Sequence, residues 1–559
     1  MENENNPEFN LIYEPWIIVR TAEGARQEVS LLDVFKNAQQ YHSLAGELPA
    51  QDTAVLRLLL AIMHGALGGK DINGTPFPDD TDNQIDGALE LWKTLWSDGL
   101  PYDRIKAYLE EFEDRFYLFH EKTPFYQIPG LDKRDDVFGP FNVAKLNGEI
   151  SESDNKIRLF QQRAGDEKTS LSYAESIRWL LYYNSYTETF GKLEGKGKTG
   201  KSDLSVGVGW LGKLGLVSVV GNNLFQTLML NFVLLDKNEN PWRDGKPIWE
   251  KPVNLRERNA IPLPASQVEL LTLQSRRVQL ERNNDRVVSF RFVSGDIFPQ
   301  EEAFSEMMTA WRYGKQQNDK NERYRPKPFQ SSVQLWRDFA SLVVQSEVDG
   351  RRMPGVIWWL KHLIGEGILP SESHFRFQTS GITYGTMQAA INDVFSDSLS
   401  FNAGLLSDLH SSWITNIIDE LGLTDKLVRE VGNLAQNIAR AAGIKDGRGE
   451  MNHGATARDE AKSMTYYRLD DNFRLWLESI DPVTDKIYDK CDEWWGIAQS
   501  IVRAYGREII GNCSPQALVG RSNQSAVEAY NWFLYYTKNK DTLNMRGVRK
   551  RGKESGSNT

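Results

Sequence analysis

Residues that could bind metals or form disulfides are scarce in this 559-residue chain. Only two cysteines occur, Cys491 and Cys513, so no disulfide framework and no cysteine-based zinc cluster can be built. The seven histidines are scattered, without H-E-x-x-H or H-x-H spacing. We therefore expect no metal, no cofactor and a reducing, cytoplasmic setting.

Long hydrophobic runs are also lacking. The most apolar stretches, AVLRLLLAIM and GVIWWLKHLIG, are interrupted by Arg57 and Lys361. Neither approaches the roughly 20 apolar residues that a membrane-spanning helix needs. The polar, acidic start MENENNPEFN does not have the character of a signal peptide. The sequence thus predicts no membrane association.

An excess of positive charge is absent as well, because 66 Lys and Arg stand against 76 Asp and Glu, giving a net charge of −10. A protein that coats DNA through its overall charge is usually basic. Any nucleic-acid binding must therefore depend on local patches. What the chain has in abundance is aromatic residues, 16 Trp, 20 Tyr and 25 Phe, which suit large cores and broad interfaces.

The length predicts two or three domains. Up to residue 398 the patterns are mixed: a strand in NLIYEPWIIVR, a buried helix over 50–68, a helix around 101–119 and short β-like runs within 216–300. Residues 130–170 and 186–215 read as long loops, and the charged segment 311–329 as exposed to solvent. We expect an α+β protein with an irregular mixed α/β N-terminal domain over 1–398.

From residue 399 onward, apolar residues recur every three or four positions, which indicates helices packed in a bundle. The predicted core stripes are Leu427, Val431, Leu434, Ile438 and Ala442; Trp494, Ala498, Ile501, Tyr505 and Ile509; and Val527, Tyr530, Phe533 and Leu534. We therefore expect an all-α C-terminal domain over 399–559, ending in a basic, disordered tail.

One stretch, EGKGKTGKS, has the letters of a Walker A phosphate-binding loop, G-x-x-x-x-G-K-S from Gly195 to Ser202. Such a loop follows a buried strand and opens a helix. Here the preceding residues are polar, and the following DLSVGVGWLGKLG carries glycines that would weaken a helix by roughly 1 kcal/mol each. An NTPase using Lys201 and Asp236, the end of a Walker B-like run, remains as an alternative.

The same segment is rich in glycine and lysine, a composition suited to phosphate groups of a nucleic acid. A solvated linker without a ligand is the competing interpretation. The lysines expected to contact phosphate are Lys196, Lys198, Lys201 and Lys213.

Several segments in order resemble the large subunit (CasA) of type I-E CRISPR Cascade complexes. They are NLIYEPWIIVR, DRFYLFHEKTPFYQ, the glycine-rich loop, SGITYGTMQAAI and the helical C-terminal region. The resemblance implies a C-terminal four-helix bundle and a subunit without catalytic activity. It further implies recognition of the PAM (the short DNA motif beside the target) in double-stranded DNA, help in opening the duplex and docking of a helicase–nuclease. The implied partners also include the other Cascade subunits and the guide RNA. Pairing of the guide RNA with the target recognises the sequence, while protein recognises the PAM.

The resemblance also implies site residues. A glutamine-bearing hairpin that separates the strands matches Gln388, with Met387 and Ala389 beside it. A helix N-terminal turn packed inside the protein is the alternative for this stretch. A glycine loop that approaches the minor groove matches Gly207, Gly209 and Gly212, with Trp210 as an unexpected member. A loop contacting guide RNA or neighbouring subunits matches Phe160, Gln161 and Gln162.

One implied element is missing, since the region expected to supply a PAM-contacting lysine reads SGDIFPQEEAF. Either another basic residue substitutes for it or the PAM preference differs. The sequence leaves three functions open: the DNA-recognition subunit, the NTPase, and a scaffold whose helical bundle binds partners without touching DNA.

Overall fold

The computed structural model describes residues 8–78, 81–134, 137–150, 163–190, 207–240, 242, 245–253, 259–315, 321–446, 453–521 and 524–545. The chain divides into two compact units. The first comprises Met1–Leu369 and Phe375–Leu399, and the second comprises Pro370–His374 and Ser400–Thr559.

The first unit is built around helix α2 (Pro49–Leu67). Its run of apolar residues is hydrophobic on all sides, as expected for a helix that is covered all round. Leu58, Leu59 and Leu60 are each at most 1% exposed. Helices α4, α6, α7 and α8 pack against α2. The helix predicted over 50–68 is confirmed.

The strands of this unit form small sheets of two or three strands. Their orders are β3-β2-β4, β6-β10-β9, β16-β15-β7, β13-β12-β14, β1-β5 and β11-β8. The bounds are β1 Glu8–Asn10, β2 Ile17–Thr21, β3 Arg26–Val29, β4 Tyr41–Leu44, β5 Tyr117–Phe119, β6 Phe138–Asn142, β7 Leu216–Val220, β8 Asn259–Ala260, β9 Arg276–Asn283, β10 Arg286–Ser294, β11 Asp296–Ile297, β12 Trp311–Gly314, β13 Arg323–Pro326, β14 Arg351–Arg352, β15 His374–Tyr384 and β16 Ile391–Asn402.

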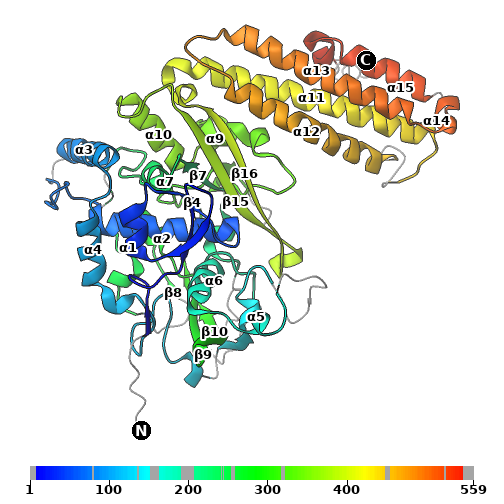
Figure 1. The fold of residues 1–559 in the computed structure, drawn as a ribbon. Coiled ribbons are helices and arrows are strands. Elements are labelled where there is room, and N and C mark those ends of the chain that lie inside the picture. Colours follow the sequence, from blue (N-terminus) through cyan, green and yellow to red (C-terminus); the bar gives the residue numbers. More distant parts are fainter. Residues whose placement is uncertain are drawn as a thin grey trace. The chain divides into compact units, whose positions relative to one another are not determined.

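Helices cover these sheets and connect them (Figure 1). Their bounds are α1 Leu31–Asn37, α3 Thr81–Asp98, α4 Tyr102–Glu111, α5 Asp166–Thr169, α6 Tyr173–Tyr186, α7 Leu224–Asn231, α8 Gln267–Leu271, α9 Phe339–Val343 and α10 Gly355–Gly365. The 3-10 turns that matter below are η4 (Trp210–Lys213) and η7 (Thr386–Gln388).

The second unit is helical, with α11 (Ser411–Ala441), α12 (Ala455–Glu478), α13 (Ile487–Gly511), α14 (Pro515–Val519) and α15 (Ala526–Tyr536). Helix α11 packs against α12, α13, α14 and α15 (Figure 1). Leu427, Val431 and Leu434 lie in its core, as predicted. Across the core, the indole of Trp494 donates a hydrogen bond of 2.9 Å to the Thr424 hydroxyl.

Other sequence-based expectations need correction. Helix α4 ends at Glu111, and residues 113–119 form a 3-10 turn and strand β5 instead of more helix. Residues 399–402 still belong to β16. The apolar stripe predicted on α13 is wrong beyond Ala498. The buried positions there are Val502 and Gly506, not Ile501, Tyr505 and Ile509. On α15, Val527 is half exposed while Ala526, Ala529 and Phe533 are buried.

Within the ranges that the structure describes, no helix has both the length and the apolar character of a membrane span. Those ranges also contain no group of three or more His, Cys, Asp or Glu side chains able to hold a metal ion.

Candidate nucleic-acid interface

Gln388 lies at the tip of the hairpin formed by β15 and β16. Strand β15 is fixed along one edge by antiparallel pairing with β7, from Arg376 opposite Val220 to Ser380 opposite Leu216. Beyond this paired region the hairpin ends in Gly385, whose N–H donates to the Ala390 carbonyl at 2.8 Å. The tip itself is exposed, and Met387 keeps 83% of its surface accessible. Gln388 is also exposed and is therefore not packed inside the protein.

The turn at this tip has an unusual composition. Met387 (φ 55°, ψ 18°) and Gln388 (φ 57°) are both left-handed, and the Ala389 N–H donates to the Thr386 carbonyl at 3.3 Å. Two successive positive φ angles define a type I′ turn, where Asn-Gly or a similar pair normally stands. Residues with a full side chain are disfavoured there by about 1–2 kcal/mol each. The tip therefore presents two large side chains in a conformation that disfavours them, as at many functional sites.

The glycine segment, Gly207–Gly215, is mostly buried and its glycines serve internal packing. A Cβ on Gly209 would lie 2.3 Å from the backbone oxygen of Ser185, at the end of α6. A Cβ on Gly212 would lie 2.1 Å from the hydroxyl of Tyr384. Gly207 differs, because its nearest neighbour is the Lys213 amino group at 3.5 Å, an ordinary contact. Among the three predicted glycines, only Gly207 has room for a side chain.

The hairpin and the glycine segment are joined directly. The Tyr384 hydroxyl, next to the tip, donates to the Tyr186 carbonyl at 2.7 Å and touches Gly212. The Gln388 carbonyl accepts a hydrogen bond of 2.9 Å from the Thr189 N–H. The structure thus brings Gln388 and Gly212, distant in sequence, to the same end of α6.

Trp210, unexpected in a glycine loop, anchors the segment in the core. Its backbone N–H donates to the Ser275 hydroxyl at 3.0 Å, and its indole N–H donates to Glu306 at 3.1 Å. Glu306 is itself paired with Arg57 of α2 through two contacts of 2.8 Å. Both members of the pair are almost fully buried. The glycine segment is therefore tied to the central helix.

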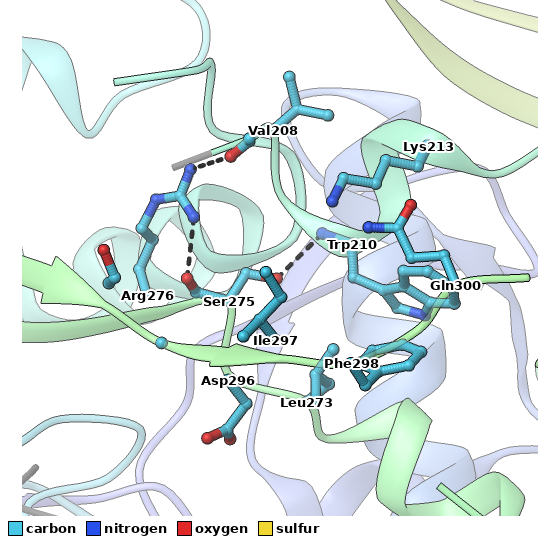
Figure 2. Close-up of a pocket in the computed structure, with 13 residues that line it drawn as sticks. Val208, Trp210, Lys213, Leu273, Ser275, Arg276, Asp296, Ile297, Phe298 and Gln300 are labelled. Carbon is cyan, nitrogen blue, oxygen red and sulfur yellow. Dashed lines mark hydrogen bonds between the residues drawn. The ribbon is translucent and has the colours of Figure 1, made fainter. Parts of the chain in front are cut away.

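A cavity of about 40 Å³ opens beside Gly207, with room for water but not for a nucleotide. Figure 2 shows Lys213 extending from η4 toward the space that Gln300 also borders. Arg276 closes another side, donating to the Gly207 carbonyl at 2.6 Å and to the Ser275 carbonyl at 2.8 Å. Asp296, Ile297 and Phe298, from the segment expected to supply a lysine, complete this wall. Lys213 is the lysine that borders the SGDIF segment in this cavity.

Burial raises the pKa of two ionisable groups near the hairpin tip. It raises the pKa of Tyr384 well above its ordinary value, so that the hydroxyl remains a hydrogen-bond donor. Burial also raises the pKa of Glu188, although Lys145 and Arg276 oppose this effect.

Some predicted residues lie outside the described ranges: Phe160, Gln161, Gln162, Lys196, Lys198, Lys201 and the terminal tail. The Walker A-like string also lies there, but its described flanks do not have the expected form. Helix α6 and a non-strand segment precede it, and Gly207–Gly209 followed by the short η4 come after it. The Asp236 carboxylate accepts the Asn238 and Asn240 N–H groups, capping its own turn.

Sequence reasoning missed three residues of this site: Thr189, Tyr384 and Arg276. Nothing in the sequence marks Thr189, because its role depends on a backbone contact with Gln388. Tyr384 stands four residues before Gln388 and was detectable as part of the hairpin. Arg276 belongs to the pair Arg276–Arg277, whose burial at 2% each could not be foreseen from an apparently polar stretch.

Comparison with known proteins identifies the family of this chain as the CRISPR-associated protein Cse1 family. Residues 10–504 match that family, and the chain belongs to it. The resemblance drawn from the sequence segments is confirmed.

Individual relatives support the assignment. CasA/Cse1 of Thermus thermophilus is 27% identical over 439 residues, which is 78% of each chain. The crystal structure of Thermobifida fusca Cse1 is 30% identical with a TM-score of 0.79, covering 96% of this chain and 99% of that one. A chain in a structure described as a CRISPR RNA-guided surveillance complex has a TM-score of 0.66 at 17% identity, covering 96% of this chain and all of its own (100%). At that identity the likeness concerns the fold alone.

Proposed function

We propose that this protein is a non-catalytic subunit of an RNA-guided CRISPR surveillance complex that recognises the PAM in double-stranded DNA and helps to open the target. The observation that carries the proposal is the exposed, left-handed Met387–Gln388 turn, which is joined through Tyr384 to Gly212 of the glycine segment. A protein of the same fold in an RNA-guided surveillance complex supports the assembly.

The chemistry of the tip suits strand separation. An apolar side chain, Met387, can insert at a base step, while the Gln388 amide can hydrogen-bond to the exposed base edges. Unstacking a base step costs a few kcal/mol. The hairpin tip, which we call the wedge, must therefore keep its conformation when it is inserted between the strands. The hydrogen bonds from Thr189 to Gln388 and from Tyr384 to Tyr186 provide that rigidity.

PAM sensing is assigned to the segment around Gly207 and Lys213. Gly207 is the glycine whose open side is free of backbone neighbours, so the chain there can approach a groove closely. Lys213 takes the place of the lysine missing from SGDIFPQEEAF, because both line the same cavity. Minor-groove readout is degenerate, so several related PAMs should be accepted.

The second unit is proposed to dock partners. Helix α11 with α12, α13 and α15 supports the four-helix bundle that the family resemblance implies. The other complex subunits, the guide RNA and a helicase–nuclease are the proposed partners, and Phe160, Gln161 and Gln162 the proposed RNA or subunit contact. Lys196, Lys198 and Lys201 are proposed to attract DNA phosphate.

The test uses the complex assembled with its partner subunits and guide RNA. Binding is measured to an intact target duplex and to the same target already unpaired beside the PAM. Gln388→Ala should weaken binding to the intact duplex roughly tenfold, about 1.4 kcal/mol, and leave the unpaired target unaffected. The matched control is Gln345→Ala, at an exposed loop glutamine of the same unit.

Two outcomes oppose the proposal. An equal loss on both targets would make Gln388 a simple contact and not a wedge. No loss on either target would favour a scaffold that binds partners without touching DNA.

A further inference from the structure

Four arginines lie on one face of the sheet β13-β12-β14. In the strand register, Arg325 stands opposite Arg312, and Arg312 stands opposite Arg351. Arg323, two residues before Arg325, is on the same face, opposite Gly314. We call these four residues the arginine face. Its row across three strands is about 10 Å wide, from strand spacing of roughly 4.8 Å.

This row is unfavourable for the fold by itself. Like charges directly opposite each other in neighbouring strands destabilise a sheet. Arg312, Arg323 and Arg351 are exposed, and none makes a side-chain hydrogen bond or ion pair with a described residue. Of the four side chains, only that of Arg325 is engaged with other residues of the described ranges, donating to the Gly314 carbonyl at 2.7 Å with Glu301 at 3.7 Å.

Arginines on the β6-β10-β9 sheet are arranged differently. Arg277 pairs with Asp296 at 2.7 Å, Arg291 pairs with Glu281 at 2.6 Å, and Arg282 pairs with Glu8. In a chain of net charge −10, acidic partners are plentiful. Their absence from the strand positions of the arginine face therefore points to an anionic ligand.

The opposite face of the same sheet is packed with aromatic rings. Phe304 contacts Trp311 and Tyr324, with centroids 5.2 and 5.7 Å apart, and the Arg352 guanidinium lies 3.7 Å above the Phe304 ring. This packing holds the sheet in place. It also turns the aromatic side chains away from the arginines, so that the arginine face offers charge and hydrogen bonds but no stacking surface for bases.

The residues just before strand β12 are hydrogen-bonded to the end of the glycine segment and to strand β7. The Gly215 N–H donates to the Thr309 hydroxyl at 2.9 Å, and the Val217 N–H donates to the Met308 carbonyl at 2.7 Å. Strand β12 begins two residues after Thr309. These hydrogen bonds fix the position of the sheet relative to the glycine segment.

We propose that the arginine face binds the sugar–phosphate backbone of a nucleic-acid strand, independently of sequence. Guanidinium groups match phosphate in charge and in their forked geometry. The inference rests on the proposed function only in taking a nucleic acid as ligand. It adds a second contact surface, separate from the hairpin.

The test measures binding of the full chain to fluorescently labelled oligothymidine and to a random-sequence duplex over a range of salt concentrations. The variant is Arg312→Gln/Arg351→Gln. The control, Arg429→Gln/Arg507→Gln, removes two exposed arginines of the helical unit and changes the net charge equally.

Loss of two phosphate contacts should reduce the slope of log affinity against log salt by about 1.4 for the single strand or about 1.8 for the duplex. The oligonucleotide that shows the change identifies the form of nucleic acid bound. The control should leave both slopes unchanged. The melting temperature of the variant should be equal or higher, because like charges are removed from neighbouring strands.

Unchanged slopes in the variant, or no salt-dependent binding by the unmodified chain, would overturn the proposal. A melting temperature lowered by the substitutions would assign the arginines to the fold and also contradict it. A negative result here can be distinguished from a negative result for the hairpin tip. Gln388→Ala is tested by comparing how the assembled complex binds the paired and the unpaired target, whereas the arginine variant is tested by the salt dependence of binding.

Discussion

The hairpin tip and the glycine segment use unusual backbone positions in opposite ways. In the glycine segment, Gly209 and Gly212 lack side chains because the chain's own Ser185 and Tyr384 occupy that space. At the hairpin tip, Met387 and Gln388 carry large side chains where glycine or asparagine would be less strained. Buried glycines here reflect packing, whereas the exposed strained pair has no packing role to explain it. The functional signal is therefore stronger at the tip.

The largest expected effect concerns the anchor of the glycine segment. Glu306→Gln leaves Arg57 charged and buried without a counter-charge, and should lower the free energy of unfolding by about 3–5 kcal/mol. Denaturant titration followed by tryptophan fluorescence would measure it. Glu508→Gln, which breaks the exposed pair with Arg468, should cost less than about 1 kcal/mol. Similar losses for both would show that the buried pair does not anchor the segment.

Gly209→Ala should destabilise the protein by about 2–3 kcal/mol, because its Cβ would collide with backbone atoms that cannot turn away. The control is Gly422→Ala, at an exposed position in α11 with no atom within 4 Å. That change should stabilise helix α11 by roughly 0.5–1 kcal/mol. A neutral Gly209→Ala in thermal unfolding would remove the packing explanation.

At the hairpin tip we expect substitution to stabilise the protein. Met387→Asn/Gln388→Gly installs the pair that a type I′ turn favours, and should raise the free energy of unfolding by about 2 kcal/mol. The same variant in the assembled complex should lose affinity for the intact duplex. Thr386→Ser, beside the turn and with ordinary backbone angles, serves as the control. A destabilised double variant would show that the two side chains support the fold.

The smallest expected change in stability belongs to Gly207→Ala. A methyl group there meets only Lys213 at an ordinary distance, so the free energy of unfolding should change by less than about 0.5 kcal/mol. Affinity of the complex for duplex DNA should nevertheless fall, because the added Cβ hinders approach to the groove. Unchanged affinity, with the fold intact, would remove Gly207 from the PAM-sensing segment.

The sequence predicted those elements whose patterns are local and strong. Helix α2 and the α11 core positions followed from continuous or periodic apolar residues. The stripes predicted on α13 and α15 were partly wrong because Tyr505 and Tyr530 were counted as core, although tyrosine side chains are long enough to remain partly exposed. Helix α4 was predicted too long because residues 113–119 retain apolar side chains while switching to a turn and a strand.

For the site, the family resemblance identified Gln388 and the glycine segment, but not how they meet. Their contact depends on the Thr189 N–H and on the Tyr384 hydroxyl, which join positions nearly 200 residues apart (|i−j| = 198 for Tyr384 and Tyr186). Such pairings arise only from the fold. The arginine face was equally hidden, because residues 311–329 read as a charged, exposed segment until the strand register aligned Arg325, Arg312 and Arg351.

The most direct test of the central claim is base unpairing itself. A fluorescent adenine analogue placed in the target beside the PAM brightens when the duplex opens, and it can be followed in the assembled complex. With a guide that cannot pair with the target, the unmodified complex should still brighten the probe, and Met387→Asn/Gln388→Gly should abolish this signal. Full brightening by the double variant would contradict the assignment of the hairpin tip as the wedge.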